Sequence, residues 1–200
     1  MTAGEPASRR GPGRPRAGDA GHTREAIVSA ARRRFAAEGF DRTSLRSIAA
    51  DAGVDASLIS HYFGDKAGLL VATMQLPVNP IALIRPLVEQ GPDGLAERIL
   101  RTFLTAWDPH PDVISGLLRT TVASQAKSAP LLEFLRTAVL GSLVEVIRGE
   151  DRELRATLLI SQLVGIATLR YVLRFEPIAV AAPDEIVRRY APVMQALITG

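Results

Sequence analysis

Apolar residues recur every three or four positions in several stretches of the chain, which is the spacing of one face of an α-helix. The first stretch follows Thr23, whose hydroxyl can cap a helix N-terminus. Gly39 ends it, because glycine is favoured just beyond the last helical turn. The apolar positions between these two residues are Ile27, Ala30, Ala31 and Phe35.

Three short helices are predicted to follow the first one. Each begins at a residue whose side-chain oxygen can accept hydrogen bonds from free backbone N–H groups. These caps are Thr43 for the second helix, Asp55 for the third and Asp65 for the fourth, which runs from Lys66 to about Leu76. The apolar faces of the four helices are expected to form one local core.

Proline and glycine divide the rest of the chain into longer segments with the same periodicity. No segment alternates apolar and polar residues for long enough to indicate a strand. The sequence therefore predicts an all-α protein. Further helices are expected at about residues 80–90, 93–107, 110–127, 130–148, 151–175 and 183–198.

The second and third helices have the layout of a helix-turn-helix. The tight turn between them contains Gly53, which supplies a backbone conformation that other residues resist. Such a motif places its second helix in the major groove of DNA. The face of the third helix that is left for this role is small and polar, and it consists of Ala56, Ser57, Ser60 and His61.

The net charge of +3 lies entirely in the N-terminal third of the chain. Residues 1–66 hold eleven basic and eight acidic residues, whereas residues 67–200 hold thirteen of each. A basic N-terminal section on a neutral body favours a polyanionic partner at that end, although a solubilising tail would have the same composition.

The run from Arg24 to Leu70 resembles the DNA-binding domain of the TetR family of transcriptional regulators. The resemblance implies a homodimer, a palindromic operator of double-stranded DNA, and a C-terminal domain that releases the DNA when it binds a small molecule. It therefore predicts a transcriptional regulator, and a repressor in particular. The matching residues are Ile27, Ala30, Ala31, Phe35, Gly39, Phe40, Thr43, Ser44, Ile48, Ala49, Ala52, Gly53, Val54, His61, Tyr62, Phe63, Asp65, Lys66, Leu69 and Leu70.

This resemblance divides the chain into a flexible basic arm (residues 1–21), a helix-turn-helix domain (22–76) and a helical ligand-binding and dimerisation domain (77–200). One position departs from the family. Ser60 stands where the family often has a tyrosine that touches the DNA backbone, and its side chain is shorter, so the resemblance does not carry that contact over to it. Tyr62 remains a DNA-binding candidate, although we expect it to pack against the core of its own domain.

Candidate DNA contacts fall into two classes. Phosphate contacts are expected at helix N-termini and from basic side chains, namely Thr43, Arg46 and Lys66. Base contacts are expected from Ser57, Ser60 and His61, with Ala56 near thymine methyl groups. Each class has a simpler alternative, because Thr43 is a helix cap in any case and His61 would also suit a solvated surface.

The arm is a second DNA-binding candidate. Its segment Gly13-Arg14-Pro15-Arg16 resembles the core of an AT-hook, in which an extended Arg-Pro segment lies in a narrow minor groove. Arg14 and Arg16 would then contact DNA. The alternative is a tail in which the arginines have no partner.

The two most apolar segments, residues 131–147 and 154–173, are predicted to form the dimer interface. In the TetR family the last two long helices pair with those of the second subunit, and apolar residues nearly encircle the second segment. The alternative is burial of both segments within one subunit. The interface candidates are Leu135, Val139, Leu143, Leu158, Gln162, Gly165, Ile166 and Leu169.

The middle helices are expected to enclose a ligand cavity with apolar walls and a few polar anchors. The candidate lining residues are Phe103, Trp107, Leu118, Thr121, Gln125 and Gln162. The competing interpretation is a DNA-binding factor without a sensor. The sequence names neither the effector nor the operator, and it does not separate repression from activation.

Other classes of protein are disfavoured. His22, His61 and His110 lie apart, without a metal-ligand cluster, a phosphate-binding loop or a nucleophile motif, so no enzyme, metal or cofactor is expected. No run approaches the roughly 18 apolar residues of a membrane span. Neither a cysteine nor a signal-peptide pattern is present, which favours a cytoplasmic protein.

Overall fold

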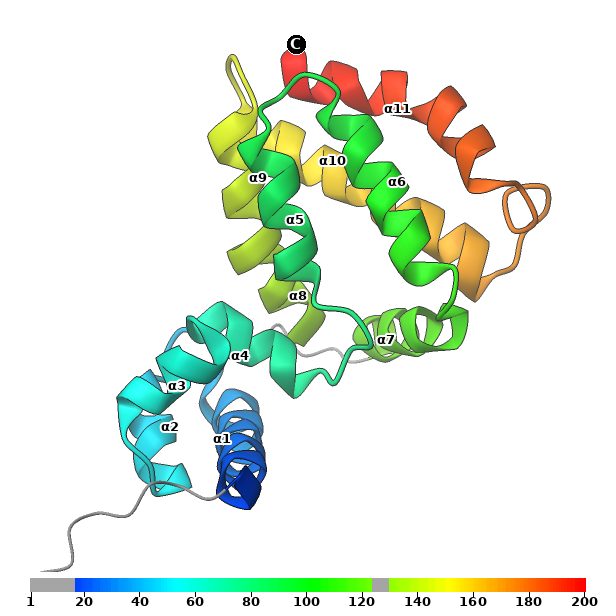
Figure 1. The fold of residues 1–200 in the computed structure, drawn as a ribbon. Coiled ribbons are helices and arrows are strands. Elements are labelled where there is room, and N and C mark those ends of the chain that lie inside the picture. The colour runs from blue at the N-terminus through cyan, green and yellow to red at the C-terminus, as the bar shows by residue number, and fades with distance from the viewer. Residues whose placement is uncertain (1–16, 124–129) are drawn as a thin grey trace, which may run out of the picture.

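The computed structural model describes residues 17–123 and 130–200, and within these ranges the chain forms helices and no strand. The all-α prediction is confirmed. A small N-terminal unit lies below a larger helical body in Figure 1. Three predicted site residues, Arg14, Arg16 and Gln125, lie outside the described residues.

The N-terminal unit, called the head below, is built from α1 (Ala17–Glu38), α2 (Leu45–Ala52), α3 (Ala56–Phe63) and α4 (Lys66–Thr73). Each helix turns an apolar face inward, as the periodicity predicts. The core of the head includes one fully buried side chain from each helix, namely Ile27, Ile48, Ile59 and Leu69. The head therefore has a core of its own.

Most ends of the head helices follow the predicted caps. Asp55 and Asp65 accept hydrogen bonds from backbone N–H groups in the first turns of α3 and α4. Gly39 and Gly53 end α1 and α2 with φ angles of 80° and 67°, in the left-handed region that favours glycine. Of these, Gly53 and the Asp55 cap define the short turn between α2 and α3.

The first helix begins earlier than the sequence indicated. It starts at Ala17 and not at Thr23, so residues 17–21, which were assigned to the arm, are helical. Alanine favours a helix, and an interior glycine such as Gly21 costs only about 1 kcal/mol. A helix that is already held by its buried face can therefore extend through these residues. A capping residue type marks a possible start, and here the helix continues past it.

The body agrees with the predicted segments. Its helices are α5 (Pro80–Glu89), α6 (Leu95–Trp107), α7 (Pro111–Ala123), α8 (Pro130–Phe134), α9 (Gly141–Val146), α10 (Arg152–Ala167) and α11 (Pro183–Thr199), with π-helical segments η1 (Leu135–Leu140) and η2 (Thr168–Val172). Helix α11 packs along α6, and α10 contacts α9 and α11. None of the described helices is both long enough and apolar enough to cross a bilayer.

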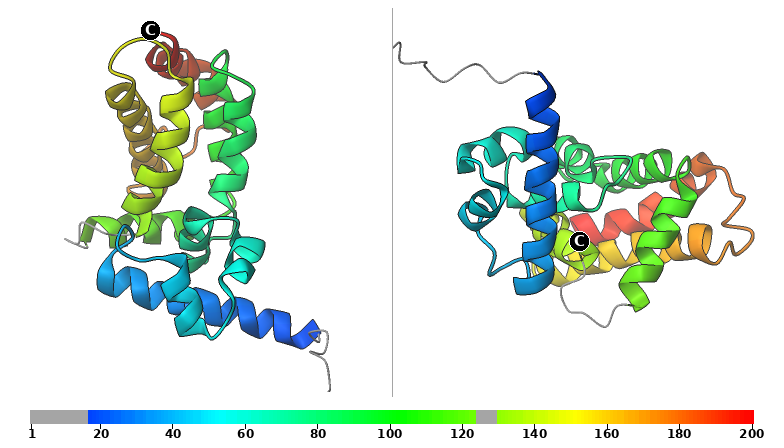
Figure 2. Two further views of the ribbon diagram at one scale, coloured as in Figure 1. Left: turned by 90° about the vertical axis from the view of Figure 1, so that its left-hand side faces the viewer. Right: turned by 90° about the horizontal axis from the view of Figure 1, so that it is seen from below.

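The head and the body meet through α4. Helix α4 packs against α8 and leads into α5, and Figure 2 shows α1 running across the base of the body. Arg136 on η1 donates to the Asp41 carboxylate in the α1–α2 loop at 2.8 Å. Because this ion pair is exposed, the packing of α4 contributes more than the ion pair to the placement of the head.

Candidate nucleic-acid interface and apolar cavity

Helix α3 turns a small polar face to the solvent. Ser57, Ser60 and His61 are exposed and Ala56 is half-buried, whereas Ile59 on the opposite face is fully buried. The imidazole of His61 lies edge-on to a neighbouring tyrosine ring and makes no hydrogen bond to any described residue. The side chains of Ser60 and His61 can therefore approach base edges without breaking a hydrogen bond to any described residue.

Ser57 is partly engaged at the N-terminus of α3. Its hydroxyl and its backbone N–H both donate to Asp55 Oδ1, at 2.5 and 2.8 Å. These two bonds hold the pKa of the Asp55 carboxyl below its usual value, and the bond from the hydroxyl contributes more than the bond from the backbone N–H. With its proton committed to Asp55, the Ser57 hydroxyl is left with lone pairs and can act as an acceptor toward a base.

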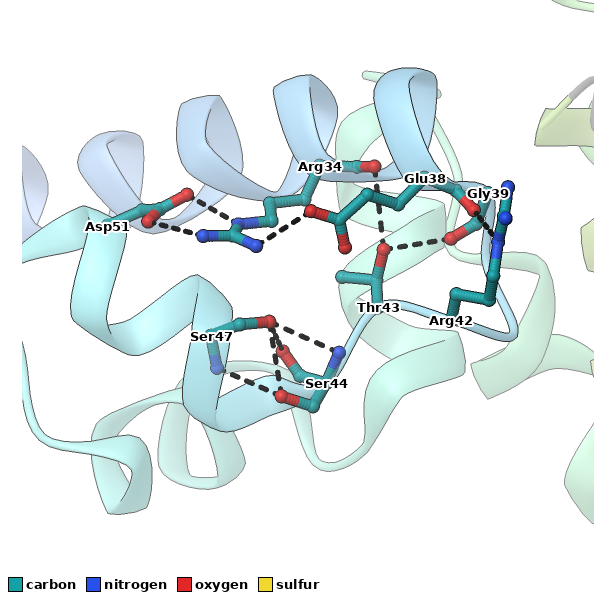
Figure 3. Close-up of polar contacts among 8 residues, drawn as sticks. All are labelled: Arg34, Glu38, Gly39, Arg42, Thr43, Ser44, Ser47 and Asp51. Carbon is teal, nitrogen blue, oxygen red and sulfur yellow. Dashed lines mark hydrogen bonds and ion pairs between the residues drawn. The ribbon is translucent and has the colours of Figure 1, made fainter.

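Thr43 neither caps α2 nor faces the solvent, so its predicted capping role is wrong. It is only 2% exposed, and its hydroxyl donates to the carbonyl of Gly39 at 2.8 Å (Figure 3). The cap is Ser44, whose hydroxyl accepts from the Ser47 backbone N–H at 3.0 Å. The Ser47 hydroxyl accepts from the Ser44 N–H at 3.2 Å in return. The three-residue spacing of Ser44 and Ser47 was a signal of this reciprocal cap.

Helix α2 is held to α1 by Arg34. Its Nε and Nη2 donate to the two carboxylate oxygens of Asp51 at 2.6 and 2.8 Å, and its Nη1 donates to Glu38 at 2.7 Å (Figure 3). The bond from Arg34 is the main cause of a lowered pKa at Asp51. Arg34 therefore has an internal role and is not a free cation for phosphate.

The remaining basic candidates differ in how many contacts already occupy their charged groups. Arg46 is exposed on α2 and has no ion pair within residues 17–123 and 130–200. Lys66 is half-buried, with its ammonium 4.3 Å from the centroid of the Phe40 ring and 3.4 Å from the Asp41 carbonyl. Tyr62 packs against the core of the head, as expected. To reach a phosphate, Lys66 would give up one long hydrogen bond and its contact with the Phe40 ring, whereas Arg46 would give up neither kind of contact.

A cavity of about 140 Å³ lies inside the body, between α5 and α10. Phe103, Trp107 and Leu118 line it, as predicted. Thr121 and Gln162 do not: the Thr121 hydroxyl donates to a carbonyl of its own helix, and Gln162 lies half-buried on α10. The described lining residues are Leu76, Pro80, Leu83, Ile84, Leu87, Ile99, Thr102, Phe103, Ala106, Trp107, Ile114, Leu117, Leu118, Leu131, Phe134, Leu135, Val139, Leu143, Ile160, Leu163, Val164 and Ala167.

The cavity reaches the connection between the head and the body. Leu76 follows α4 and Pro80 begins α5, and both line the cavity. Leu131 and Phe134 line it from α8, the helix that packs against α4. A molecule bound at this end of the cavity would therefore contact the segments that position the head.

Half of the predicted interface residues lie inside the subunit. Leu135, Val139 and Leu143 line the cavity, and Ile166 is 5% exposed in the core. The first three turn inward because the apolar face of η1 and α9 forms the cavity wall, and Ile166 turns inward from α10, so we leave these four out of the proposed interface. The outer face of this segment is polar and carries Arg136.

Three of the other interface candidates lie on an exposed stripe along α10 and η2, called the α10 stripe below, and the fourth, Gln162, is half-buried on the same helix. Leu158, Gly165 and Leu169 are exposed, and Leu154 and Leu173 extend the stripe at its two ends. A Cβ atom added at Gly165 would meet no atom within 4 Å. A contiguous exposed apolar surface of this kind marks an interaction surface.

A polar cluster that the sequence did not reveal ties η2 to the end of α6. Arg170 Nε and Nη2 donate to the two carboxylate oxygens of Asp108 at 2.8 Å each, and the Tyr171 hydroxyl donates to Asp108 at 2.7 Å. Burial raises the pKa of Asp108, but the hydrogen bonds from Arg170 and Tyr171 outweigh it and the net pKa is lowered. Arg170 Nη1 also donates to the carbonyls of Ile178 and Ala181.

A helical body behind a helix-turn-helix head with an exposed third helix defines a class, the DNA-binding transcriptional regulators. The family model described as bacterial regulatory proteins of the tetR family matches residues 27–73. The model described as the tetracyclin repressor-like C-terminal domain matches residues 93–198. The chain belongs to the TetR family of transcriptional regulators.

Similar proteins carry regulator names. A TetR-family regulator from Streptomyces coelicolor A3 is similar over 94% of this chain and 100% of its own, with 38% identity and a TM-score of 0.51. The HTH-type transcriptional regulator BetI of Burkholderia cenocepacia (strain HI2424) is 32% identical over 117 residues, which is 56% of this chain. BetI of Burkholderia thailandensis is 42% identical over 52 residues. The match spans 59% of the length of the first BetI and 27% of the second.

Proposed function

We propose that this regulator is a homodimeric repressor that leaves a palindromic operator when a small molecule enters the cavity. The observation that carries the proposal is the position of Leu76 and Pro80, which line the cavity and also connect α4 of the head to α5 of the body. A ligand shifts an equilibrium only if it binds one state better than the other. A molecule that contacts this connection would bind one placement of the head better than another, and would therefore favour the state that does not bind the operator.

On the DNA side, α3 would read base edges through Ser57, Ser60 and His61. Phosphate contacts would come from Arg46 and Lys66, and from the exposed N-terminus of α2 where Ser44 provides the cap. Arg14 and Arg16 of the arm are proposed to lie in the adjacent minor groove.

The second copy would dock on the α10 stripe. Helix α11 packs beside α10 and exposes Val193, so α11 replaces residues 131–147 as the second helix of the proposed interface. We keep the proposed division into a DNA-binding domain ending near Leu76 and a ligand-binding and dimerisation domain after it. Two copies held in this way would present two α3 helices to one duplex.

The experiment is selection of a binding site from random DNA, followed by binding measurements at several salt concentrations. The expected site has dyad symmetry, with half-sites about one helical turn apart or somewhat more. Affinity should fall steeply with salt, because phosphate contacts dominate it. A selected site without dyad symmetry would contradict the proposal.

The ligand part is tested by a thermal-shift screen together with a reporter gene under the selected operator. Compounds that bind the folded state raise the melting temperature, and the same compounds should raise reporter expression. A DNA-binding factor without a sensor would be stabilised by no compound class. If the protein is an activator, deletion of its gene should lower reporter expression, whereas deletion of a repressor gene should raise it.

A further inference from the structure

The lining of the cavity carries a chemical preference. None of the described lining residues is ionisable, and the side chains that carry a hydrogen-bonding atom are Thr102 and Trp107. All the others are aliphatic or phenylalanine. A charged group placed in such a site loses its hydration and gains no partner, so its binding is strongly disfavoured.

The ion pair next to Trp107 in the chain cannot supply a counter-charge. Asp108 follows Trp107 directly, but both of its carboxylate oxygens accept from Arg170 and one also accepts from Tyr171. Arg170 uses its remaining nitrogen on two backbone carbonyls. These charges are satisfied by each other, so an ionic ligand would have to break an internal network to use them.

The size of the cavity limits the ligand as well. Protein interiors hold few voids larger than a water molecule, and this one is about 140 Å³. An apolar cavity of about 150 Å³ stays dry and accepts benzene in another protein. The space therefore matches a molecule with one ring or a short branched chain.

We propose that the cavity binds an uncharged, mainly hydrocarbon compound about the size of a single aromatic ring. This inference rests on the proposed ligand-responsive function and adds the chemical class of the effector. Anionic and cationic compounds of the same size are excluded by the absence of an ionisable group among the described lining residues.

The test uses three compounds of one size, namely toluene, benzoate and benzylammonium, with the full-length protein. Trp107 is the single tryptophan of the chain and lines the cavity, so its fluorescence reports occupancy directly. Toluene should change this fluorescence saturably and raise the melting temperature. Benzoate and benzylammonium should bind at least about 100-fold more weakly, because each would bury an unpaired charge.

Two variants locate the binding. Ala106→Leu adds side-chain volume to the cavity wall and should abolish the toluene response. Ala123→Leu makes the same change at an exposed position of α7 that does not line the cavity, and should leave the response intact. If Ala106→Leu does not fold, Leu163→Phe places extra volume in the same cavity and repeats the test.

The inference is overturned if toluene does not bind, if either ion binds as tightly as toluene, or if the cavity-filling variants still respond. Operator binding measured in parallel separates this inference from the proposed function. Toluene that binds the cavity and leaves operator affinity unchanged would refute ligand release while supporting the ligand class. A charged probe that binds and releases the operator would refute the class and support ligand release.

Discussion

At the residue scale, Thr43 and Ser44 are adjacent hydroxyl residues with different roles. Thr43 is buried and bonded to the Gly39 carbonyl, while Ser44 is exposed and caps α2. Both residue types are good N-caps, so residue type alone did not separate them. The direction of the chain between Gly39 and α2 places one hydroxyl inside the head and the other outside it.

Thr43→Val should lower the free energy of unfolding by about 1–2 kcal/mol, because the nearly isosteric valine leaves the Gly39 carbonyl without its donor. The salt dependence of operator binding should not change, since the hydroxyl is buried and already bonded to the Gly39 carbonyl. Denaturant unfolding and binding titrations measure the two effects. Ser44→Ala is the matched comparison and should weaken operator binding as well. If the Thr43→Val protein has normal stability and a flatter salt dependence, the result would support a phosphate contact by the Thr43 hydroxyl.

Lys66→Ala and His61→Ala should affect operator binding in different ways. Loss of the Lys66 phosphate contact should weaken binding about equally for all DNA sequences and lower the salt slope by about one. Loss of His61 should relax the preference at one position of each half-site, by roughly 1–3 kcal/mol for a good base contact. Binding to a panel of single-base operator variants measures both. An unchanged preference in His61→Ala would remove His61 from the reading face.

At the scale of elements, side-chain hydrogen bonds hold η2 to the end of α6. The Asp108 carboxylate lies at the end of α6 and holds Arg170 and Tyr171 of η2. Arg170 in turn fixes the segment between η2 and α11 through the carbonyls of Ile178 and Ala181. This cluster joins parts of the chain that are far apart in sequence, which is why periodicity did not reveal it.

Asp108→Asn should destabilise the body by about 2–3 kcal/mol. This is below the roughly 3–5 kcal/mol for a fully buried pair, because the Asp108 side chain keeps 27% of its surface exposed. The folded-state pKa of Asp108 is lowered. The stabilisation is therefore complete above the unfolded pKa of about 4 and is lost as the pH falls through the lower folded value.

The measurement is the free energy of unfolding of the wild type and Asp108→Asn between neutral pH and about pH 3. The difference between the two proteins should be constant near neutrality and shrink in acid. A difference that grows as the pH falls would mean that Asp108 is not held in its ionised form.

At the scale of the whole molecule, the α10 stripe consists of apolar residues that the protomer leaves exposed. Leu154, Leu158, Leu169 and Leu173 all remain exposed. The space beside Gly165 is open in the protomer, so whatever fills it comes from outside the subunit. This observation sharpens the expected effect of a large residue at that position.

Gly165→Arg should leave the protomer folded and abolish dimer formation, because the new side chain has room in one subunit but would bury its charge between two. Operator affinity should then fall sharply, since a single head engages only one half-site. Sedimentation and a binding assay measure the two effects. Gly141→Arg is the control, because Gly141 is also exposed with no atom within 4 Å of an added Cβ, but lies on α9, outside the α10 stripe. A dimeric Gly165→Arg protein with normal operator affinity would place the interface elsewhere.

The sequence by itself determined the all-α class, the turn at Gly53, the caps Asp55 and Asp65, and the polar face of α3. These features depend on residues close together in the chain, so local periodicity and capping chemistry are sufficient to define them. Phe103, Trp107 and Leu118 were also identified as cavity residues. They are large apolar residues in the middle helices, and residue type alone identified them as candidate cavity walls.

Only the tertiary structure decided which apolar faces turn inward and which remain exposed. Leu135 and Leu158 belong to equally apolar segments, yet one lines the cavity and the other lies on the α10 stripe. The burial of Thr43 and the pairing of Asp108 with Arg170 were decided in the same way. A helical pattern shows that a face is apolar, but the partner of that face depends on how distant segments pack.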